Sequence, residues 1–341
     1  MTLPARFDSV EAVEDFMTTP SDALVADLAR TPGDIMVLGV GGKMGPTLAR
    51  LAKRAAPGKR VMGVARFSEA GVREALVEAG VEPVAADLLD RAQLEKLPKA
   101  PNIVFMAGRK FGAAGDVPLT WAVNVQVPAM VAEVFRGSRI VVFSTGCVYP
   151  FVPVESGGAS EDTAPVPPPG DYAATCAGRE RMFEYFSAKY GTPGRLFRLN
   201  YAIDMRYGVL HDIGRKVRDG ETIDLSMGHV NVIWQGDANT VALRCLAHAT
   251  TPTTPINVTG PETIEVRWAA GEFGKLLGKT PKFAGTPAAT GWLNDSRRMV
   301  KEFGPPSVPL FTMIEWTADW LARGMATINK PTHYEVRDGR Y

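Results

Sequence analysis

The chain has 341 residues, of which 45% are hydrophobic and 22% are charged, and these proportions are usual for a folded globular protein. Its 38 Lys and Arg side chains balance 37 Asp and Glu to a formal net charge of +1, so no basic field is present to attract nucleic acid or an anionic membrane surface. No apolar run approaches the ~20 residues that span a bilayer, and we therefore expect neither a nucleic-acid partner nor a membrane partner.

The pattern after residue 30 is that of a parallel sheet. Two short helices are expected first, within residues 1–30. Short continuous apolar runs then alternate with helical stretches, and these runs lie at 35–40, 61–65, 82–85, 103–107 and 140–144. Runs of this kind indicate strands that helices bury on both faces. Because parallel crossovers are right-handed, the pattern predicts an α/β fold with a Rossmann-type doubly wound parallel sheet.

Beyond residue 150 the pattern changes. Residues 150–171 are rich in Pro, Gly, Ser and acidic side chains, which is typical of a surface loop over an active site. A helix at 172–190 and a strand near 195–199 follow, and past residue 200 the alternation weakens. The predicted division is a helical extension at 1–30, a dinucleotide-binding domain at 31–199 with parts of 229–260, a smaller C-terminal substrate lobe at 200–228 and 261–330, and a C-terminal tail at 331–341.

A glycine-rich turn connects the first predicted strand to the helix after it. The glycines at 39, 42 and 45 give the spacing G-x-x-G-x-x-G. Such a turn lets a pyrophosphate approach the backbone and meet the positive N-terminus of the next helix. A plain tight turn is the alternative, but the first strand–helix junction of an alternating pattern favours dinucleotide binding. The predicted cofactor contacts are Gly39, Gly41, Gly42, Lys43, Met44 and Gly45.

The end of the second predicted strand indicates which dinucleotide binds. NAD-binding proteins usually place Asp or Glu there, whereas this chain has Arg66 and Ser68. A guanidinium and a hydroxyl suit the 2′-phosphate of NADP, although Arg66 on the adenine face or in solvent is the alternative. We therefore predict NADP as the preferred cofactor, with NAD as the alternative. Asp87 and Leu88, which end the third strand, are expected to flank the adenine.

Further landmarks follow in a fixed order. They are FMAGRKFG at 105–112, Asn124 in WAVNVQ, FSTGCVY at 143–149, Tyr172 after an acidic and proline-rich stretch, Asn200 in RLNY, and Asp237 in WQGD. Together with the glycine turn, this order resembles the NAD(P)-dependent epimerase/dehydratase family of extended short-chain dehydrogenases. The resemblance covers most of residues 33–330.

The resemblance implies a site for hydride transfer. Tyr172 takes the place of the acid/base tyrosine, and Thr145, with Ser144, takes the place of the hydroxyl that holds the substrate oxygen as it gains carbonyl character. Alternatively, Tyr172 is a surface aromatic residue that packs against the start of a helix, and the Thr145 hydroxyl only forms a hydrogen bond at the end of a strand. The resemblance also places Asn200 at the substrate, and at the cofactor it places Ala107, Gly108, Lys110 and Asn124.

One departure from the family pattern concerns catalysis. The family motif is Tyr-x-x-x-Lys, but this sequence has Tyr172 followed by Cys176. An ordinary tyrosine has a pKa of about 10, and in the family the Lys lowers it. Lys110 is the first candidate to replace that Lys, and Arg179, seven residues after Tyr172, is a weaker one. A small buried helix residue is the expected role of Cys176.

A second departure concerns the substrate. Nucleotide-sugar epimerases place an Arg seven residues before the position of Asp237 to clamp the diphosphate, and this chain has Val230 there. Loss of that bidentate anchor favours a smaller polyhydroxylated or hydroxy-carbonyl substrate. His229 and Trp234 are candidate pocket residues, with core packing as the alternative.

The sequence therefore predicts an NAD(P)-dependent oxidoreductase, epimerase or dehydratase that acts by hydride transfer on a small molecule. Two alternatives stay open: a catalytically silent NAD(P)-binding regulatory protein, and a nucleotide-sugar enzyme with rearranged anchors. The three cysteines are odd in number and widely spaced, so we expect no disulfide framework and a cytoplasmic protein. The four histidines lack the spacing of metal ligands, so we expect no metal site. The resemblance also implies a homodimer that forms through the helices near 118–137 and 172–190.

Overall fold

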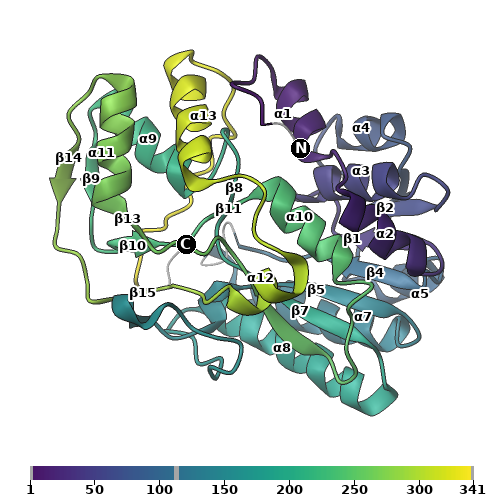
Figure 1. Ribbon diagram of the computed structural model, residues 1–341. Coiled ribbons are helices and arrows are strands. Elements are labelled where there is room, and N and C mark those ends of the chain that lie inside the picture. The colour runs from purple at the N-terminus through teal and green to yellow at the C-terminus, as the bar shows by residue number, and fades with distance from the viewer. Residues whose placement is uncertain (1–2, 111–114, 339–341) are drawn as a thin grey trace.

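Seven parallel strands form the centre of the computed structural model, which describes residues 3–110 and 115–338 (Figure 1). In spatial order they are β3 (Glu82–Ala85), β2 (Val61–Ala65), β1 (Ile35–Leu38), β4 (Asn102–Phe105), β5 (Arg139–Thr145), β7 (Gly194–Leu199) and β12 (Thr254–Val258). The chain thus builds the sheet outward from β1 in one direction and then in the other. The Rossmann-type doubly wound sheet predicted from the apolar runs is confirmed.

Helices cover both faces of this sheet. One face carries α2 (Asp22–Arg30), α3 (Gly45–Ala55), α4 (Val72–Glu78), α10 (Gln235–Arg244) and α12 (Arg297–Phe303). The other face carries α5 (Arg91–Lys96), α7 (Val127–Val134) and α8 (Asp171–Tyr190), with α6 (Val117–Trp121) against α8. Alternate residues of β1 belong to different cores, since Val37 packs with the first group and Leu38 with the second. This double burial explains why the strands read as continuous apolar runs.

A second group of elements lies beside the sheet, at the upper left of Figure 1. Three mutually contacting helices form its centre: α9 (Val209–Asp219), α11 (Val266–Leu277) and α13 (Leu310–Ala322). Four short strand pairs surround them and join the two parts. These pairs are β6 (Val152–Pro153) with β15 (Thr290–Gly291), β8 (Ala202–Ile203) with β11 (Ile233–Trp234), β9 (Thr222–Asp224) with β14 (Lys282–Ala284), and β10 (His229–Val230) with β13 (Ile264–Glu265).

The first 30 residues contain the two helices expected of them. In α1 (Val10–Met17) the Ser9 side chain caps the N-terminus, and Ser21 does the same for α2. The ring of Phe16 packs against Trp234 and Trp316, so α1 seals one end of the junction between the sheet and the second group of helices.

The C-terminal strap, residues 325–338, crosses the second group of helices toward the carboxyl edge of the sheet. Thr332 is fixed there, because its N–H and its hydroxyl both donate to one carboxylate oxygen of Asp212, at 2.8 and 2.7 Å. Further along, Arg337 donates to the backbone oxygen and hydroxyl of Thr290. The end of the predicted tail, 339–341, lies outside the described residues.

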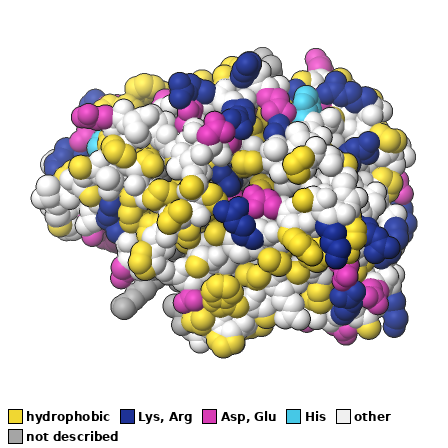
Figure 2. Space-filling model, turned by 90° about the horizontal axis from the view of Figure 1, so that it is seen from below, with side chains coloured by type: hydrophobic (Ala, Val, Ile, Leu, Met, Phe, Trp, Pro, Cys, Tyr) yellow, Lys and Arg dark blue, Asp and Glu magenta, His cyan; other side chains and the backbone are white. Residues whose placement is uncertain are grey.

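The surface beneath α8 is mixed in character. Figure 2 shows hydrophobic patches on this face separated by Lys, Arg and acidic side chains. Within the described ranges, no helix is both long enough and apolar enough to cross a membrane.

Candidate active site

Two adjoining pockets lie over the carboxyl ends of the central strands, at the point where the strand order reverses. We call them the outer pocket, of about 500 Å³, and the inner pocket, of about 260 Å³. Gly39, Gly42, Met106 and Lys110 line both, so the glycine turn and the end of β4 form their common boundary. Ligands of doubly wound sheets bind at this reversal point.

The glycine turn is shaped for close backbone approach. Gly39 has φ +88°, and an added Cβ would lie 2.5 Å from the backbone nitrogen of Ala107. At Gly45, where α3 begins, a Cβ would lie 2.1 Å from the carbonyl oxygen of Val40. The turn therefore holds α3 tightly against β1 with its N-terminus at the pockets, and these residues fit a dinucleotide pyrophosphate.

The outer pocket brings together the residues expected around the adenosine half of the cofactor. Arg66 and Ser68 come from the end of β2, where Phe67 adopts the left-handed φ of 53°. The remaining expected residues in its lining are Gly41, Asp87, Leu88, Ala107 and Gly108. No acidic side chain replaces Arg66 at the end of β2, although Glu69 lies on the rim of the same pocket.

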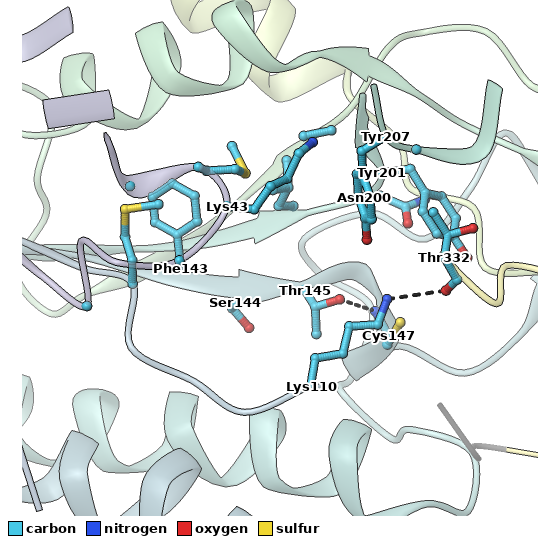
Figure 3. A pocket seen from close by; sticks show the side chains of 18 of the residues that line it. Lys43, Lys110, Phe143, Ser144, Thr145, Cys147, Asn200, Tyr201, Tyr207 and Thr332 are labelled. Carbon is cyan, nitrogen blue, oxygen red and sulfur yellow. Dashed lines mark hydrogen bonds between the residues drawn. The ribbon is translucent and has the colours of Figure 1, made fainter. Parts of the chain in front are cut away.

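The inner pocket brings together the expected catalytic residues. Lys110, Ser144, Thr145, Tyr172 and Asn200 all line it. Figure 3 shows Thr145 and Lys110 on one side and Asn200 on another. Further lining residues that the sequence interpretation missed include Cys147, Tyr201, Tyr207 and Thr332. Thr332 had no sequence signal, because the strap brings it from more than 100 residues away in the chain.

Thr145 and Ser144 are neighbours in sequence but have different surroundings. The Thr145 hydroxyl accepts a hydrogen bond of 3.2 Å from the backbone N–H of Cys147, and its own proton can still be donated into the pocket. The Ser144 hydroxyl donates at 2.5 Å to Glu180, which is buried in an ion pair with Arg198. Of the two hydroxyls, Thr145 is therefore the one placed to bind a substrate oxygen, and Ser144 ties β5 to α8.

Tyr172 is followed one helical turn along α8 by Cys176, at the place where a lysine is expected from the sequence motif. Its hydroxyl is hydrogen-bonded to the Cys176 side chain one helical turn along α8. Burial, with a smaller contribution from Cys176, holds the pKa of Tyr172 well above its usual value. Burial also raises the pKa of the Cys176 thiol to about 11. Tyr172 is consequently a protonated phenol throughout the neutral range.

Lys110 is the inner pocket's cation nearest to this pair. Its ammonium lies 3.5 Å from the carbonyl oxygen of Thr332 in the strap. Burial lowers the pKa of Lys110, and the charges of Cys147, Cys176 and Asp212 oppose that shift. The segment that follows, 111–114, which includes the end of the FMAGRKFG landmark, lies outside the described residues.

Arg179 and Asn124 do not line either pocket, although the charge of Arg179 still acts on Tyr172, where it opposes the rise in pKa that burial causes. Arg179 donates to the carbonyl oxygen of Phe143 at 2.8 Å and to the Asn124 side chain at 2.9 Å, so its charge is directed into the protein. The Asn124 amide also binds both backbone groups of Arg109, at 2.8 and 3.0 Å. Asn124 thus acts through Arg109: it fixes the backbone that presents Lys110.

His229 and Trp234 also lie away from the inner pocket, so they do not contact a substrate there. Trp234 is buried between Phe16 of α1 and Trp316 of α13. His229 pairs with Glu265 in the β10–β13 ladder. Core packing, the alternative weighed for both, describes Trp234, because the N-terminal extension supplies an aromatic neighbour that the local sequence does not reveal. His229 is only partly buried. Asn200 does line the inner pocket and donates to the carbonyl oxygen of Trp292 at 3.2 Å.

The described residues hold no cluster of His, Cys, Asp or Glu with the geometry of a metal site. The three cysteines at 147, 176 and 245 are all buried free thiols.

Comparison with known proteins gives the same fold. Residues 35–203 match the family model described as the NAD dependent epimerase/dehydratase family. The chain is similar to UDP-glucose 4-epimerase from Thermus thermophilus in complex with NAD, with 21% identity over 84% of this chain and 98% of that chain and a TM-score of 0.68. It is also similar to UDP-glucose 4-epimerase from Thermotoga maritima with UDP-glucose, at 16% identity, 85% and 99% coverage and a TM-score of 0.69.

A third similar structure is the dTDP-glucose 4,6-dehydratase from Streptomyces venezuelae with NAD bound. Its identity is 20%, with 85% of this chain and 97% of that chain covered and a TM-score of 0.71. At these identities the likeness establishes the fold. No curated protein matches the chain in sequence.

Proposed function

Because the chain belongs to the NAD dependent epimerase/dehydratase family of enzymes, we propose that it transfers hydride between NAD(P) and a small polyhydroxylated or hydroxy-carbonyl substrate. The observation that carries this proposal is that Tyr172 and Thr145 line the same pocket as the glycine turn. A bound nicotinamide supplies the hydride chemistry, and the protein supplies position and proton transfer.

The roles of the side chains follow from their surroundings. Thr145 donates its hydroxyl proton in a hydrogen bond to the substrate oxygen and stabilises the charge that develops there. Tyr172 gives a proton to that oxygen when a carbonyl is reduced and takes it back when an alcohol is oxidised. The raised pKa keeps Tyr172 protonated at neutral pH, so the phenol carries the proton that reduction consumes, whereas oxidation requires that proton to leave first, and this favours the reductive direction. The Lys110 ammonium supplies positive charge beside the pair.

Two observations support a small substrate. The inner pocket holds about 260 Å³, below the roughly 300–1,000 Å³ of pockets for drug-sized ligands, and Tyr201, Tyr207 and Thr332 close its far side. Val230, at the position of the family's diphosphate-clamping Arg, is fully buried and paired with Ile264. The similar solved structures include complexes with UDP-glucose, so a nucleotide-sugar enzyme with rearranged anchors is the second candidate. Thermal stabilisation by UDP or dTDP would favour that candidate.

Hydride transfer is tested on the purified protein by the change in nicotinamide absorbance. NADPH and NADH are supplied with a panel of small carbonyl compounds, and NADP⁺ and NAD⁺ are supplied with a panel of small alcohols. Turnover that disappears in Tyr172→Phe supports the proposal. Tight cofactor binding without turnover of any member of the panel supports a silent NAD(P)-binding protein instead.

We propose that NADP is preferred over NAD. Arg66 and Ser68 line the outer pocket at the end of β2, where a 2′-phosphate would lie beside the guanidinium. Loss of a hydrogen bond to a charged group costs about 1.5–3 kcal/mol, so Arg66→Ala is expected to weaken NADP binding by about 10- to 100-fold and to leave NAD binding unchanged. Calorimetric titration measures both affinities.

Arg73 offers a matched control for Arg66. Its guanidinium lies 5.9 Å from the Phe67 ring centroid and it does not line the outer pocket, so Arg73→Ala is expected to keep the affinity for NADP. Equal binding of NAD and NADP by the unaltered protein would contradict the preference.

We also propose a homodimer that forms through α6, α7 and α8. Trp121 and Tyr185 are large side chains on this surface that are 43% and 57% exposed, and the hydrophobic patches of Figure 2 lie on the same side of the molecule. Light scattering during size exclusion is expected to give twice the chain mass, and Tyr185→Glu is expected to give a monomer. A monomeric unaltered protein would exclude this interface.

A further inference from the structure

Lys43 enters the inner pocket from the glycine turn with an ammonium group that makes no hydrogen bond within the described residues. Its Nζ is buried, 4.2 Å from the centroid of the Tyr207 ring and 3.9 Å from Oδ2 of Asp204. An ammonium has three donors, and leaving buried donors unpaired costs free energy. The sequence interpretation assigned Lys43 only to the cofactor turn. Its side chain instead extends toward the loop at 200–208, which forms the substrate side of the pocket.

Asp204 does not satisfy Lys43, because Arg206 holds it. The Asp204 carboxylate accepts hydrogen bonds from the backbone N–H of Arg206 at 2.7 Å and from its guanidinium at 3.1 Å. Arg206 is itself fixed by Glu14 of α1 at 2.7 Å. The carboxylate therefore attracts the ammonium without accepting a hydrogen bond from it, and the donors of Lys43 stay unpaired within the described residues.

The remaining charge of the inner pocket is also positive. Its lining, as far as the structure describes it, contains Lys43 and Lys110 and no Asp or Glu. In Figure 3 the two lysines approach the pocket from different sides, with Thr145 near Lys110. An anionic ligand in the space between the two lysines is attracted by both ammonium groups, and no described carboxylate in the lining repels it.

We propose that the substrate is a small hydroxy acid whose carboxylate binds the Lys43 ammonium while its reacting hydroxyl lies at Thr145 and Tyr172. This inference rests on the proposed function, because it names the substrate class of the same site. A carboxylate oxygen supplies the acceptor that Lys43 lacks and forms a charge-assisted hydrogen bond with it. The Lys110 ammonium adds to the positive potential at the opposite side of the pocket.

The pKa of Lys43 gives the proposed contact between its ammonium and a carboxylate a pH dependence that can be measured. Burial lowers the pKa of Lys43 to about 8, with Asp204 opposing the shift. The carboxylate of a hydroxy acid stays ionised above this pH, whereas the ammonium loses its charge. The affinity for the acid is therefore expected to fall as the pH rises above 8, by about tenfold per pH unit.

The test is calorimetric titration of the NADP-loaded protein with D-glucuronate and D-gluconate, beside the matched neutral probes D-glucose and D-glucitol. The carboxylates are expected to bind at least about tenfold more tightly than their neutral counterparts, since a hydrogen bond to a charged group is gained. Lys43→Met is expected to remove that difference and to leave the affinity for NADP unchanged. Lys275→Met is the control, because Lys275 is exposed on α11 and pairs only with Glu272.

The outcomes separate this inference from the proposed function. Equal affinity for carboxylate and neutral probes, or undiminished carboxylate binding in Lys43→Met, overturns the inference, and hydride transfer assayed on the alcohol panel still tests the function independently. Loss of NADP binding in Lys43→Met assigns the lysine to the cofactor and also overturns it. The pH dependence is measured on the unaltered protein, so a carboxylate affinity that stays constant from pH 7 to 10 overturns the inference even if Lys43→Met fails to fold. If the unaltered protein binds neither NADP nor NAD, the proposed function fails, and the inference fails with it.

Discussion

Replacing Tyr172 by Phe is expected to lower kcat by about 10²- to 10⁴-fold, the range in which a positioned acid or base contributes to catalysis. The substitution removes one oxygen atom from a ring that α8 holds at the inner pocket, so packing and cofactor affinity should change little. Single-turnover rates of nicotinamide oxidation and reduction, with NADP affinity measured beside them, check this expectation.

Tyr201→Phe is the matched control. Tyr201 lines the same pocket, and burial likewise raises its pKa well above the usual value, but it lies on the loop after β7 and has no counterpart in the acid/base motif. It is expected to alter KM more than kcat. If Tyr172→Phe retains the kcat of the unaltered protein, or if the two variants lose kcat equally, the proton is transferred by another group.

The sheet could be predicted from sequence because the residues that specify each strand lie within or next to that strand. Central strands such as β1 and β2 are short apolar runs, and residues such as Val37 and Leu38 are both buried because helices cover opposite faces. The glycine turn was equally readable, since Gly39 and Gly45 have no room for a side chain. These signals lie within a few residues of the structure that they specify.

The inner pocket was less predictable because side chains from distant segments decide it. The register of a motif fixes where the backbone of Lys43 or Asn124 lies, but it does not say where the side chain points. Lys43 turns toward the 200–208 loop because Asp204 lies there. Asn124 turns inward because the backbone N–H of Arg109 donates to its side chain and the Thr175 hydroxyl accepts from it. Thr332 reaches the pocket only through the strap.

Trp234 shows a third limit. An aromatic residue next to a family landmark is as compatible with a substrate pocket as with a core. Trp234 lies in the core because Phe16 in the N-terminal extension and Trp316 in α13 both pack against its indole ring. No pattern within the segment around Trp234 carries that information.

Cys176, which we propose to stand in place of the family's motif lysine, leads to the second large expected effect. Restoring the motif by Cys176→Lys should increase the rate of alcohol oxidation at neutral pH by about tenfold or more, because each unit by which the tyrosine pKa falls multiplies the ionised fraction about ten times. In the unaltered protein, burial and Cys176 raise the pKa of Tyr172, so oxidation should accelerate as the pH rises. An ammonium one helical turn away favours the phenolate, and the rising limb of the pH–rate profile should move to lower pH.

Cys176→Met separates charge from the loss of the thiol. Methionine is unbranched and neutral, so it removes the hydrogen bond between Cys176 and Tyr172 without adding a cation. Thermal melting shows whether each variant is folded, which matters because Cys176 is buried and the lysine must extend into the inner pocket. If folded Cys176→Lys and Cys176→Met give the same pH–rate profile, ionisation of Tyr172 does not limit oxidation. If only the lysine variant shifts toward acid, the chain has kept the catalytic tyrosine of its family while losing the cation that ionises it, and reduction at neutral pH is the direction in which a protonated Tyr172 serves.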